Sequence, residues 1–444
     1  MFENIFSGNF RVGIFGGGLS GKATAEWCAR HGINFAIFDQ DGGAEFTGEI
    51  ATSFDLIVRS PSFLNDHPWV ILARRGKVAC IGELDLAAKF WRGKIVAVTG
   101  TDGKTTTVEF LKHSLRSIGC QAVAVGNIGC PFIGAADDNA ANARDSWAIV
   151  EVSSFQAQQL QMMRPDYLLW TNFAPDHLDK HRSMGEYFAA KYRLVEVAKF
   201  RDGEHVFIGK SVENYAKNRP EFDLLNDATI CGEGDVPDSS CLNIPVQRKN
   251  FALVENFWNA NCFEVERLKA AAETFRLPKH RLQKINSIGK VGANGDRFSV
   301  EFWNDSKATN FHAFKAALDS FDRKLILIVG GKSKNEDVEQ HIAALLTCAK
   351  ALFLFGEMGR VIFDALDERN LRGAFESCEF FGDERSNSQD IMRNIVGSAF
   401  SVASAEDVVL LCPGFSSLDM FTGYDQRGCM YEECVDGLIG DECT

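Results

Sequence analysis

A glycine-containing loop at residues 100–106, Gly-Thr-Asp-Gly-Lys-Thr-Thr, follows an apolar run over 94–99. Such a loop between a strand and a helix points backbone N–H groups at an anion on the positive end of the helix dipole. Lys104 would then neutralise phosphate charge, and Thr105 would offer a hydroxyl to Mg²⁺. The spacing is shorter than in the usual Walker loop, so a turn that only begins a helix is the alternative. The segment predicts a nucleoside triphosphate site.

Carboxylate and imidazole side chains follow two further apolar runs. Glu151 stands at the end of one run, where sites form in parallel sheets, and could hold Mg²⁺ opposite the loop. A solvated acid at a strand end is the alternative. The segment over 171–181 gathers possible oxygen and nitrogen ligands, with Lys191 beyond it on an expected helix: Asn172, Asp176, His177, Asp179 and His181. A second ligand cluster is therefore predicted here, although a single histidine in such a loop is usually structural.

A second glycine-rich turn, Gly-Gly-Gly-Leu-Ser-Gly over 16–21, follows the apolar run at 11–16. Its glycines satisfy G-x-G-x-x-G, and Asp39 lies about 20 residues further on, as in dinucleotide-binding folds. By itself this turn also suits a nicotinamide-dependent oxidoreductase. Either interpretation puts a diphosphate on the N-terminus of the helix expected over 19–31.

These segments need a scaffold of alternating strands and helices. Residues 34–38 complete a first strand–helix–strand unit, and 94–99 opens a second with a helix over 105–118. Further buried strands are expected at 148–152, 167–172, 205–209, 324–329, 350–355 and 408–412. The pattern predicts an α/β fold with parallel sheets. Boundaries are expected near 90–93 and within 276–283.

Composition excludes several classes of protein. The 444 residues carry 47 Lys and Arg against 60 Asp and Glu, a formal net charge of −13, so a nucleic-acid binder is not expected. The 13 cysteines are scattered without a C-x-x-C pair, which indicates reduced thiols. No apolar run of ~18 residues and no secretory leader are evident, so we expect a cytoplasmic protein without membrane attachment.

Together these motifs resemble the Mur ligases, ATP-dependent amide-forming enzymes of peptidoglycan precursor synthesis. The matching strings are GTDGKTTT (100–107), GNIGCP (126–131), EVSSFQ (151–156), TNFAPDHLDKH (171–181) and the helix carrying Lys191. NDSKATN (304–310) and SSLDMFTGYDQRG (416–428) are similar to the strings of the members that add D-glutamate. The resemblance spans nearly the whole chain, and together with the phosphate loop it favours a UDP-sugar over a nicotinamide cofactor in the 16–21 turn.

The resemblance implies three domains and a defined reaction. A Rossmann-like UDP-binding domain is expected over 1–92, a P-loop ATPase-like domain over 93–279 and a Rossmann-like C-terminal domain over 280–444. The expected enzyme is a monomer that joins D-glutamate to UDP-N-acetylmuramoyl-L-alanine, with ATP and two Mg²⁺ ions, through an acyl phosphate. Phosphorylation turns a carboxylate oxygen into a leaving group, and the metal ions offset repulsion between carboxylate and γ-phosphate.

The resemblance also implies roles for single residues. Catalytic roles fall to Lys104, His177, Lys191 and Lys307. ATP would be bound by Gly103, Lys104, Thr105, Asn261, Arg281 and Asp305. The UDP-sugar would be bound by Leu19, Ser20, Asp39, Ser60, Asn127 and His177. D-Glutamate would be bound by Thr309, Lys334, Ser417 and Tyr424. Metal ions would be held by Thr105, Glu151, His177 and Lys191, the last expected to be carbamylated.

The adenine region departs from the family. Of the usual H-N-x-x-N string only Asn261 is matched, at the end of 257–261, and Trp258 would either stack on adenine or pack inside. The stretch from Asn261 to Arg281 is shorter than usual and is expected to lack a helix. These changes leave two alternatives open beside the oxidoreductase: a ligase for another amino acid, and a nucleotide-binding relic without activity. Retention of the charged residues argues against the relic.

Overall fold

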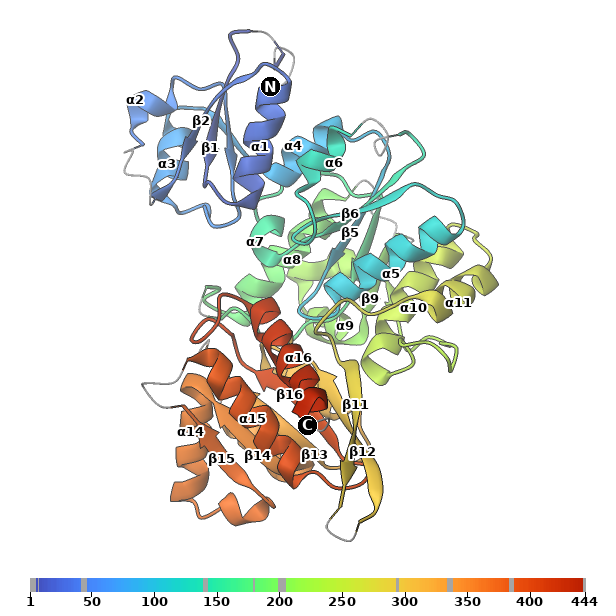
Figure 1. Cartoon of the computed structure of the whole chain (residues 1–444). Helices are drawn as coiled ribbons and strands as arrows, with labels where there is room; N and C mark the ends of the chain where they lie inside the picture. The colour runs from blue at the N-terminus through green and yellow to red at the C-terminus, as the bar shows by residue number, and fades with distance from the viewer. Residues whose placement is uncertain are drawn as a thin grey trace. The chain divides into compact units, whose positions relative to one another are not determined.

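The computed structural model describes residues 5–6, 8–40, 46–138, 143–178, 180–198, 205–292, 295–333, 338–382 and 387–441. The chain forms two compact units, the first made of Met1–Ala174 and His181–Arg276, the second of Pro175–Lys180 and Leu277–Thr444. The first unit contains two β-sheets and the second contains one (Figure 1). The α/β fold expected from the sequence is confirmed.

The first sheet has four parallel strands in the order β2-β1-β3-β4. Its strands are β1 (Arg11–Phe15), β2 (Asn34–Phe38), β3 (Leu56–Arg59) and β4 (Ala79–Gly82). Its helices are α1 (Leu19–Arg30), α2 (Gly48–Ala51), α3 (Pro68–Arg75) and α4 (Glu83–Phe90). The 16–21 turn joins β1 to α1, so it lies at the carboxyl edge of this sheet.

The second sheet has six strands in the order β10-β9-β8-β5-β7-β6, all parallel. Its strands are β5 (Lys94–Thr99), β6 (Ala122–Gly126), β7 (Trp147–Glu151), β8 (Tyr167–Trp170), β9 (Val206–Gly209) and β10 (Thr229–Cys231). Its helices are α5 (Lys104–Ser117), α6 (Phe132–Ala136), α7 (Ser154–Ala157), α8 (Met184–Val197), α9 (Lys210–Ala216), α10 (Pro245–Ala260) and α11 (Val265–Thr274), with a 3₁₀ helix at Pro220–Leu225. The phosphate loop follows β5, at the centre of the sheet.

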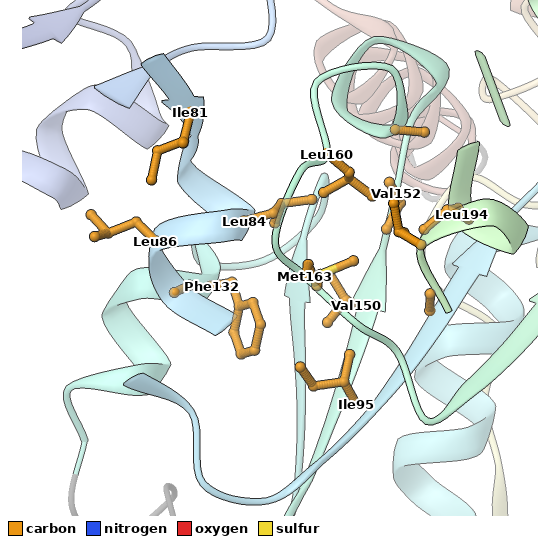
Figure 2. Close-up of a cluster of buried hydrophobic side chains, with 14 of the residues drawn as sticks. Ile81, Leu84, Leu86, Ile95, Phe132, Val150, Val152, Leu160, Met163 and Leu194 are labelled. Atoms are coloured by element: carbon orange, nitrogen blue, oxygen red, sulfur yellow. The ribbon is translucent and has the colours of Figure 1, made fainter. Parts of the chain in front are cut away.

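One hydrophobic core joins these two sheets. Leu84 of α4 points toward Leu160, which follows α7, and Phe132 of α6 packs in the same cluster (Figure 2). Two buried carboxylates of α4 face the second sheet's segments as well. Glu83 accepts the backbone N–H of Ile133 at 2.6 Å, and Asp85 accepts those of Gln161, Met162 and Met163 at 2.8–2.9 Å. The two sheets of the first unit therefore share packing and buried polar contacts.

The third sheet has the order β11-β12-β16-β13-β14-β15. Its strands are β11 (Gln283–Val291), β12 (Arg297–Asn304), β13 (Leu325–Gly330), β14 (Ala349–Phe355), β15 (Cys378–Phe381) and β16 (Val408–Gly414). Its helices are α12 (Phe311–Leu318), α13 (Val338–Cys348), α14 (Gly356–Glu368), α15 (Ser388–Val402) and α16 (Tyr424–Asp441), with a 3₁₀ turn at Arg372–Ala374. Only β11 pairs antiparallel, as a hairpin with β12; the remaining pairs are parallel.

Most of the expected strands are present within one or two residues of their predicted bounds. One expectation is wrong: the stretch between Asn261 and Arg281 does contain a helix, α11, whose Leu268, Ala271 and Ala272 are buried. Its short apolar face was not distinguished from a loop in the sequence. Among the described residues, no helix combines the length and apolar character needed to cross a lipid bilayer.

Candidate active site

The phosphate loop is open toward the N-terminus of α5. Gly103 precedes this helix with φ +78°, a left-handed conformation that favours glycine, and provides no side-chain cap for the first N–H groups. The Lys104 ammonium donates to the carbonyls of Gly100 at 2.9 Å and Thr101 at 2.6 Å. The loop thus brings together a cation and uncapped helical N–H groups, the two features that bind phosphate.

The segment after β8 fixes the backbone of the loop. The Asn172 side chain accepts the N–H of Asp102 at 2.9 Å and donates to the Asp102 carbonyl at 3.1 Å. The Thr171 hydroxyl donates to the same carbonyl at 2.6 Å. Asn172 therefore acts on the loop's backbone, a structural contact that its position in a cluster of ligand-type residues did not reveal.

A carboxylate with two polar partners lies beside the loop. Glu151, at the end of β7, is 2% exposed; its Oε2 accepts the Thr105 hydroxyl at 2.8 Å and its Oε1 accepts the Asn127 amide at 2.9 Å. Three predicted site residues are thus in direct contact. A hydroxyl beside a carboxylate is the hard oxygen donor set that suits Mg²⁺, so these residues fit the ion expected there.

Lys191 lies on α8 and is 1% exposed. Its ammonium donates to the Gly100 carbonyl at 2.7 Å and lies 4.8 Å from the centre of the Tyr187 ring. The side chain therefore reaches the phosphate loop from a helix that begins more than 80 residues later. Its nitrogen and that of Lys104 contact the same backbone oxygen.

The adenine-side prediction divides into two locations. Asn261 ends α10 and accepts the Tyr167 hydroxyl at 2.9 Å, at the N-terminal end of β8, whereas the loop lies at the carboxyl ends of the strands. Trp258 is fully buried and donates to the Glu264 carbonyl at 2.9 Å, so it packs in the core and does not offer a stacking face.

An earlier turn of α10 carries polar residues that sequence reasoning missed. Asn250 is 4% exposed, and a Cβ added at Gly103 would meet its Oδ1 at 2.5 Å. Its amide donates to the Gln247 side chain at 2.8 Å. The i, i+3 spacing puts both amides on one helix face. Such spacing in a long helix was a usable signal, although it does not say which turn reaches the loop.

The 16–21 turn is held in place for a close approach of its backbone. A Cβ at Gly21 would lie 1.8 Å from the Gly16 carbonyl oxygen, so a glycine is required there. The Asp39 carboxylate accepts the Gly17 N–H at 2.5 Å, and the Ser60 hydroxyl, next to Gly16, is buried without a hydrogen-bond partner. Leu19 is 78% exposed at the start of α1, followed by Ser20. The predicted UDP-sugar residues of this sheet therefore lie around one turn, apart from Asn127, which contacts Glu151.

In the second unit, predicted residues gather at the carboxyl ends of β12 and β16. The Asp305 carboxylate accepts the N–H of Leu282, the residue after Arg281, at 3.0 Å. The Lys307 ammonium lies 3.9 Å from the centre of the Tyr424 ring, at the start of α16. Thr309 and Ser417 follow the same two strands.

Arg427 organises this cluster and was not predicted. It is fully buried and donates to Ser306 and to the Phe415 carbonyl, at 2.8–3.3 Å. Burial lowers the pKa of its guanidinium to about 9. Because Ser306 in turn donates to the Tyr424 carbonyl at 2.8 Å, Arg427 connects the segment after β12 to that after β16.

The histidines of the 171–181 segment differ in environment. His177 has φ +54° and its Nε2 lies 3.5 Å from the Asp176 carboxylate, within the short stretch that belongs to the second unit. His181 is buried, stacks on Phe155 at 5.1 Å and contacts the Ser154 hydroxyl at 2.9 Å, a structural environment. Asp179 and Lys334 lie outside the described residues. No group of three His, Cys, Asp or Glu residues in metal-binding geometry occurs in the part of the chain that the structure describes.

The Mur ligase middle domain model matches residues 98–222, and the model for the Mur ligase glutamate ligase domain matches residues 280–415. A protein of Acidobacterium capsulatum named UDP-N-acetylmuramoylalanine–D-glutamate ligase is 30% identical, with 96% of each chain covered. The chain belongs to the Mur ligase family. A ligase of the same name from Aquifex aeolicus is 29% identical to this Mur ligase over 95% of its length and 98% of the relative's.

Solved structures have the same fold as this Mur ligase. A pseudomurein peptide ligase type C from Methanothermus fervidus aligns with a TM-score of 0.55 and 17% identity, over 96% of this chain and 100% of the other. The UDP-N-acetylmuramate–alanine ligase of Thermotoga maritima aligns with a TM-score of 0.55 and 15% identity, over 96% and 99%. These similarities show the multidomain α/β architecture, and the acceptor of this Mur ligase is argued from other evidence.

Proposed function

We propose that this Mur ligase joins D-glutamate to UDP-N-acetylmuramoyl-L-alanine in peptidoglycan precursor synthesis, with hydrolysis of ATP to ADP and phosphate. The observation that carries the proposal is the phosphate loop with its Thr105–Glu151 contact, in a chain similar over 96% of its length to ligases named for this reaction. ATP dependence is a property of the family.

The proposed reaction has two steps. A carboxylate oxygen of the UDP-sugar substrate attacks the γ-phosphorus, and ADP leaves. The amine of D-glutamate then attacks the acyl carbon, loses a proton, and expels phosphate to leave the amide. Lys104 and the first N–H groups of α5 would balance the phosphate charge in the first step, since preorganised donors stabilise developing charge.

Two Mg²⁺ ions are part of the proposal. Thr105 and Glu151 would hold the first, and His177 and Lys191 would contribute to the second. Bound there, the ions would offset the repulsion between the substrate carboxylate and the triphosphate. A carbamate on Lys191 would replace a buried ammonium with an anionic ligand; its burial against the Gly100 carbonyl supports a neutralised or modified nitrogen near phosphate and metal.

The substrate ends are assigned in the same way. We propose that the 16–21 turn holds the UDP diphosphate, supported by the uncapped start of α1 and the unpartnered Ser60 hydroxyl. Asn127, beside Glu151, would contact the sugar. Thr309, Ser417, Tyr424 and Lys334 would bind D-glutamate, with Arg281, Asp305 and Lys307 near the nucleotide and acyl phosphate. The enzyme would be a cytoplasmic monomer with domains 1–92, 93–279 and 280–444.

The test is phosphate release from ATP with UDP-N-acetylmuramoyl-L-alanine and either D-glutamate, L-glutamate, L-lysine or diaminopimelate. Release that requires D-glutamate, and that Lys104→Ala abolishes while the protein stays folded, supports the proposal. Release with a different amino acid would overturn the acceptor assignment, and release with none would favour an inactive nucleotide-binding relic.

A further inference from the structure

A cavity of about 530 Å³ lies along the edge strand β4, within the first unit. We call it the β4-edge cavity. Four cationic side chains line it: Arg59, Arg74, Lys77 and Arg193. The remaining polar side chains of its lining are amides and the Cys80 thiol, and none of the described lining residues is Asp or Glu. In a chain with a net charge of −13, this is a local concentration of positive charge.

Arg59 is the buried member of this set, at 1% exposure. One of its terminal nitrogens donates to the Phe63 carbonyl and the other to the Asn65 side-chain oxygen, both at 2.8 Å, while its Nε is buried without a partner. A buried charge is normally paired, because removing it from water without a counter-ion is costly. The guanidinium therefore has both an unmet charge and an unused donor.

The other cations leave the positive charge largely uncompensated. Arg74 donates to the same Asn65 oxygen at 2.6 Å, so two guanidinium groups share one neutral acceptor. Within the described chain, neither Arg59, Arg74 nor Lys77 lies within 4 Å of a carboxylate. Arg193 does pair with Glu196, at 2.9 Å, on the exposed side. Burial, together with the nearby charge of Arg74, lowers the pKa of Arg59.

We propose that the β4-edge cavity binds a small phosphate-bearing anion, for which inorganic pyrophosphate is the probe. Guanidinium groups donate in forks that match phosphate oxygens, and two phosphate groups supply enough charge for several cations. Amides of Gln158 and Gln161 add further hydrogen-bonding groups. The cavity is separate from the phosphate loop, and its lining does not include the 16–21 turn or Asp39.

The test is calorimetric titration of pyrophosphate, without Mg²⁺, into the full-length chain carrying Lys104→Ala, which weakens binding at the phosphate loop. Adding Arg74→Gln and Lys77→Gln, both at exposed positions, should weaken the affinity at least about 10-fold, because two charge-assisted contacts are lost. Arg75→Gln is the matched control, since Arg75 follows Arg74 on α3 and does not line the cavity. It should change the affinity less than about two-fold.

Three results would overturn the proposal: no pyrophosphate binding in the Lys104→Ala chain, equal binding after the double substitution, or an equal loss with Arg75→Gln. Glutarate at the same ionic strength tests the ligand class. If it binds as tightly as pyrophosphate with the same dependence on Arg74 and Lys77, the site is not a phosphate site. Circular dichroism of each variant verifies that the fold is retained.

Discussion

At the scale of single residues, the site depends on side chains that already hold one another without substrate. Glu151 accepts hydrogen bonds from Thr105 and Asn127, so its carboxylate is oriented from both sides. Preorganisation of this kind lets charge be stabilised without rearrangement during the reaction. The carboxylate's charge, more than its shape, is then what the chemistry uses.

Glu151→Gln tests this view, because glutamine keeps the shape and removes the charge. Turnover should fall about 100-fold or more, and the Mg²⁺ concentration for half-maximal rate should rise. Initial rates over a Mg²⁺ series measure both. Glu264→Gln, an exposed carboxylate at the start of α11, is the control and should behave as the parent. An unchanged Mg²⁺ requirement in Glu151→Gln would remove the residue from the metal site.

Asn250 and Asn261 provide a second comparison, on the same helix. Asn250 lies against Gly103, so Asn250→Ala should raise the KM for ATP about 10-fold by loosening the loop. Asn261→Ala removes an amide at the far end of β8 and should change that KM less than about two-fold. ATP saturation curves for both variants decide between them, and the reverse ranking would restore Asn261 as the nucleotide contact.

At the scale of elements, the 16–21 turn is limited by the approach of two backbones. Gly21→Ala would put a methyl group 1.8 Å from the Gly16 carbonyl, so the turn must shift. Binding of the UDP-sugar substrate should weaken about 10-fold or more, measured by calorimetry. Gly18→Ala, where an added Cβ meets nothing within 4 Å, is the matched control. Equal affinities in the two variants would mean that the turn does not bind the substrate.

The α4–α6 contact predicts a pH dependence of stability. Burial raises the pKa of Glu83 from an ordinary 4.5 to about 7, so the folded state disfavours the ionised form. The group therefore lowers the free energy of unfolding as pH rises from about 4.5 to about 7, by about 3 kcal/mol, with no further loss above. Glu83→Gln removes this term, and its Tm relative to the parent should increase between pH 5 and pH 8. A constant difference across that range would contradict the prediction.

The sequence predicted elements better than it predicted contacts. The apolar runs before the phosphate loop and before Glu151 are long enough to identify buried parallel strands, and the loop's glycines mark a turn. The antiparallel hairpin of β11 and β12 is half exposed and has no comparable signal. Asn250 was missed because a pattern shows which residues share a helix face but not which turn meets the loop. Likewise, nothing local marks Glu83 and Asp85 as buried, since their partners are 50 to 78 residues away.

At the scale of the whole molecule, the shared core of the first unit should make its two sheets lose protection together. Asp85→Ala would leave three backbone N–H groups, of Gln161, Met162 and Met163, without their acceptor. Buried donors left unpaired cost about 1–3 kcal/mol each. Hydrogen exchange should then accelerate over 79–90 and over 158–170 alike. Acceleration confined to one sheet would show that the sheets open independently.

The contacts of Asp85 also constrain when the first sheet can be completed during synthesis on the ribosome. Its most distant acceptor contact joins residues 78 positions apart in the chain. At ~5–20 residues per second, that stretch takes roughly 4–16 s to translate. Until Met163 emerges, the carboxylate on α4 lacks these partners and its surrounding apolar face lacks Leu160 and Met163. The N-terminal sheet is therefore a nascent-chain segment that waits for the next one, and it is a natural client for chaperones during that interval.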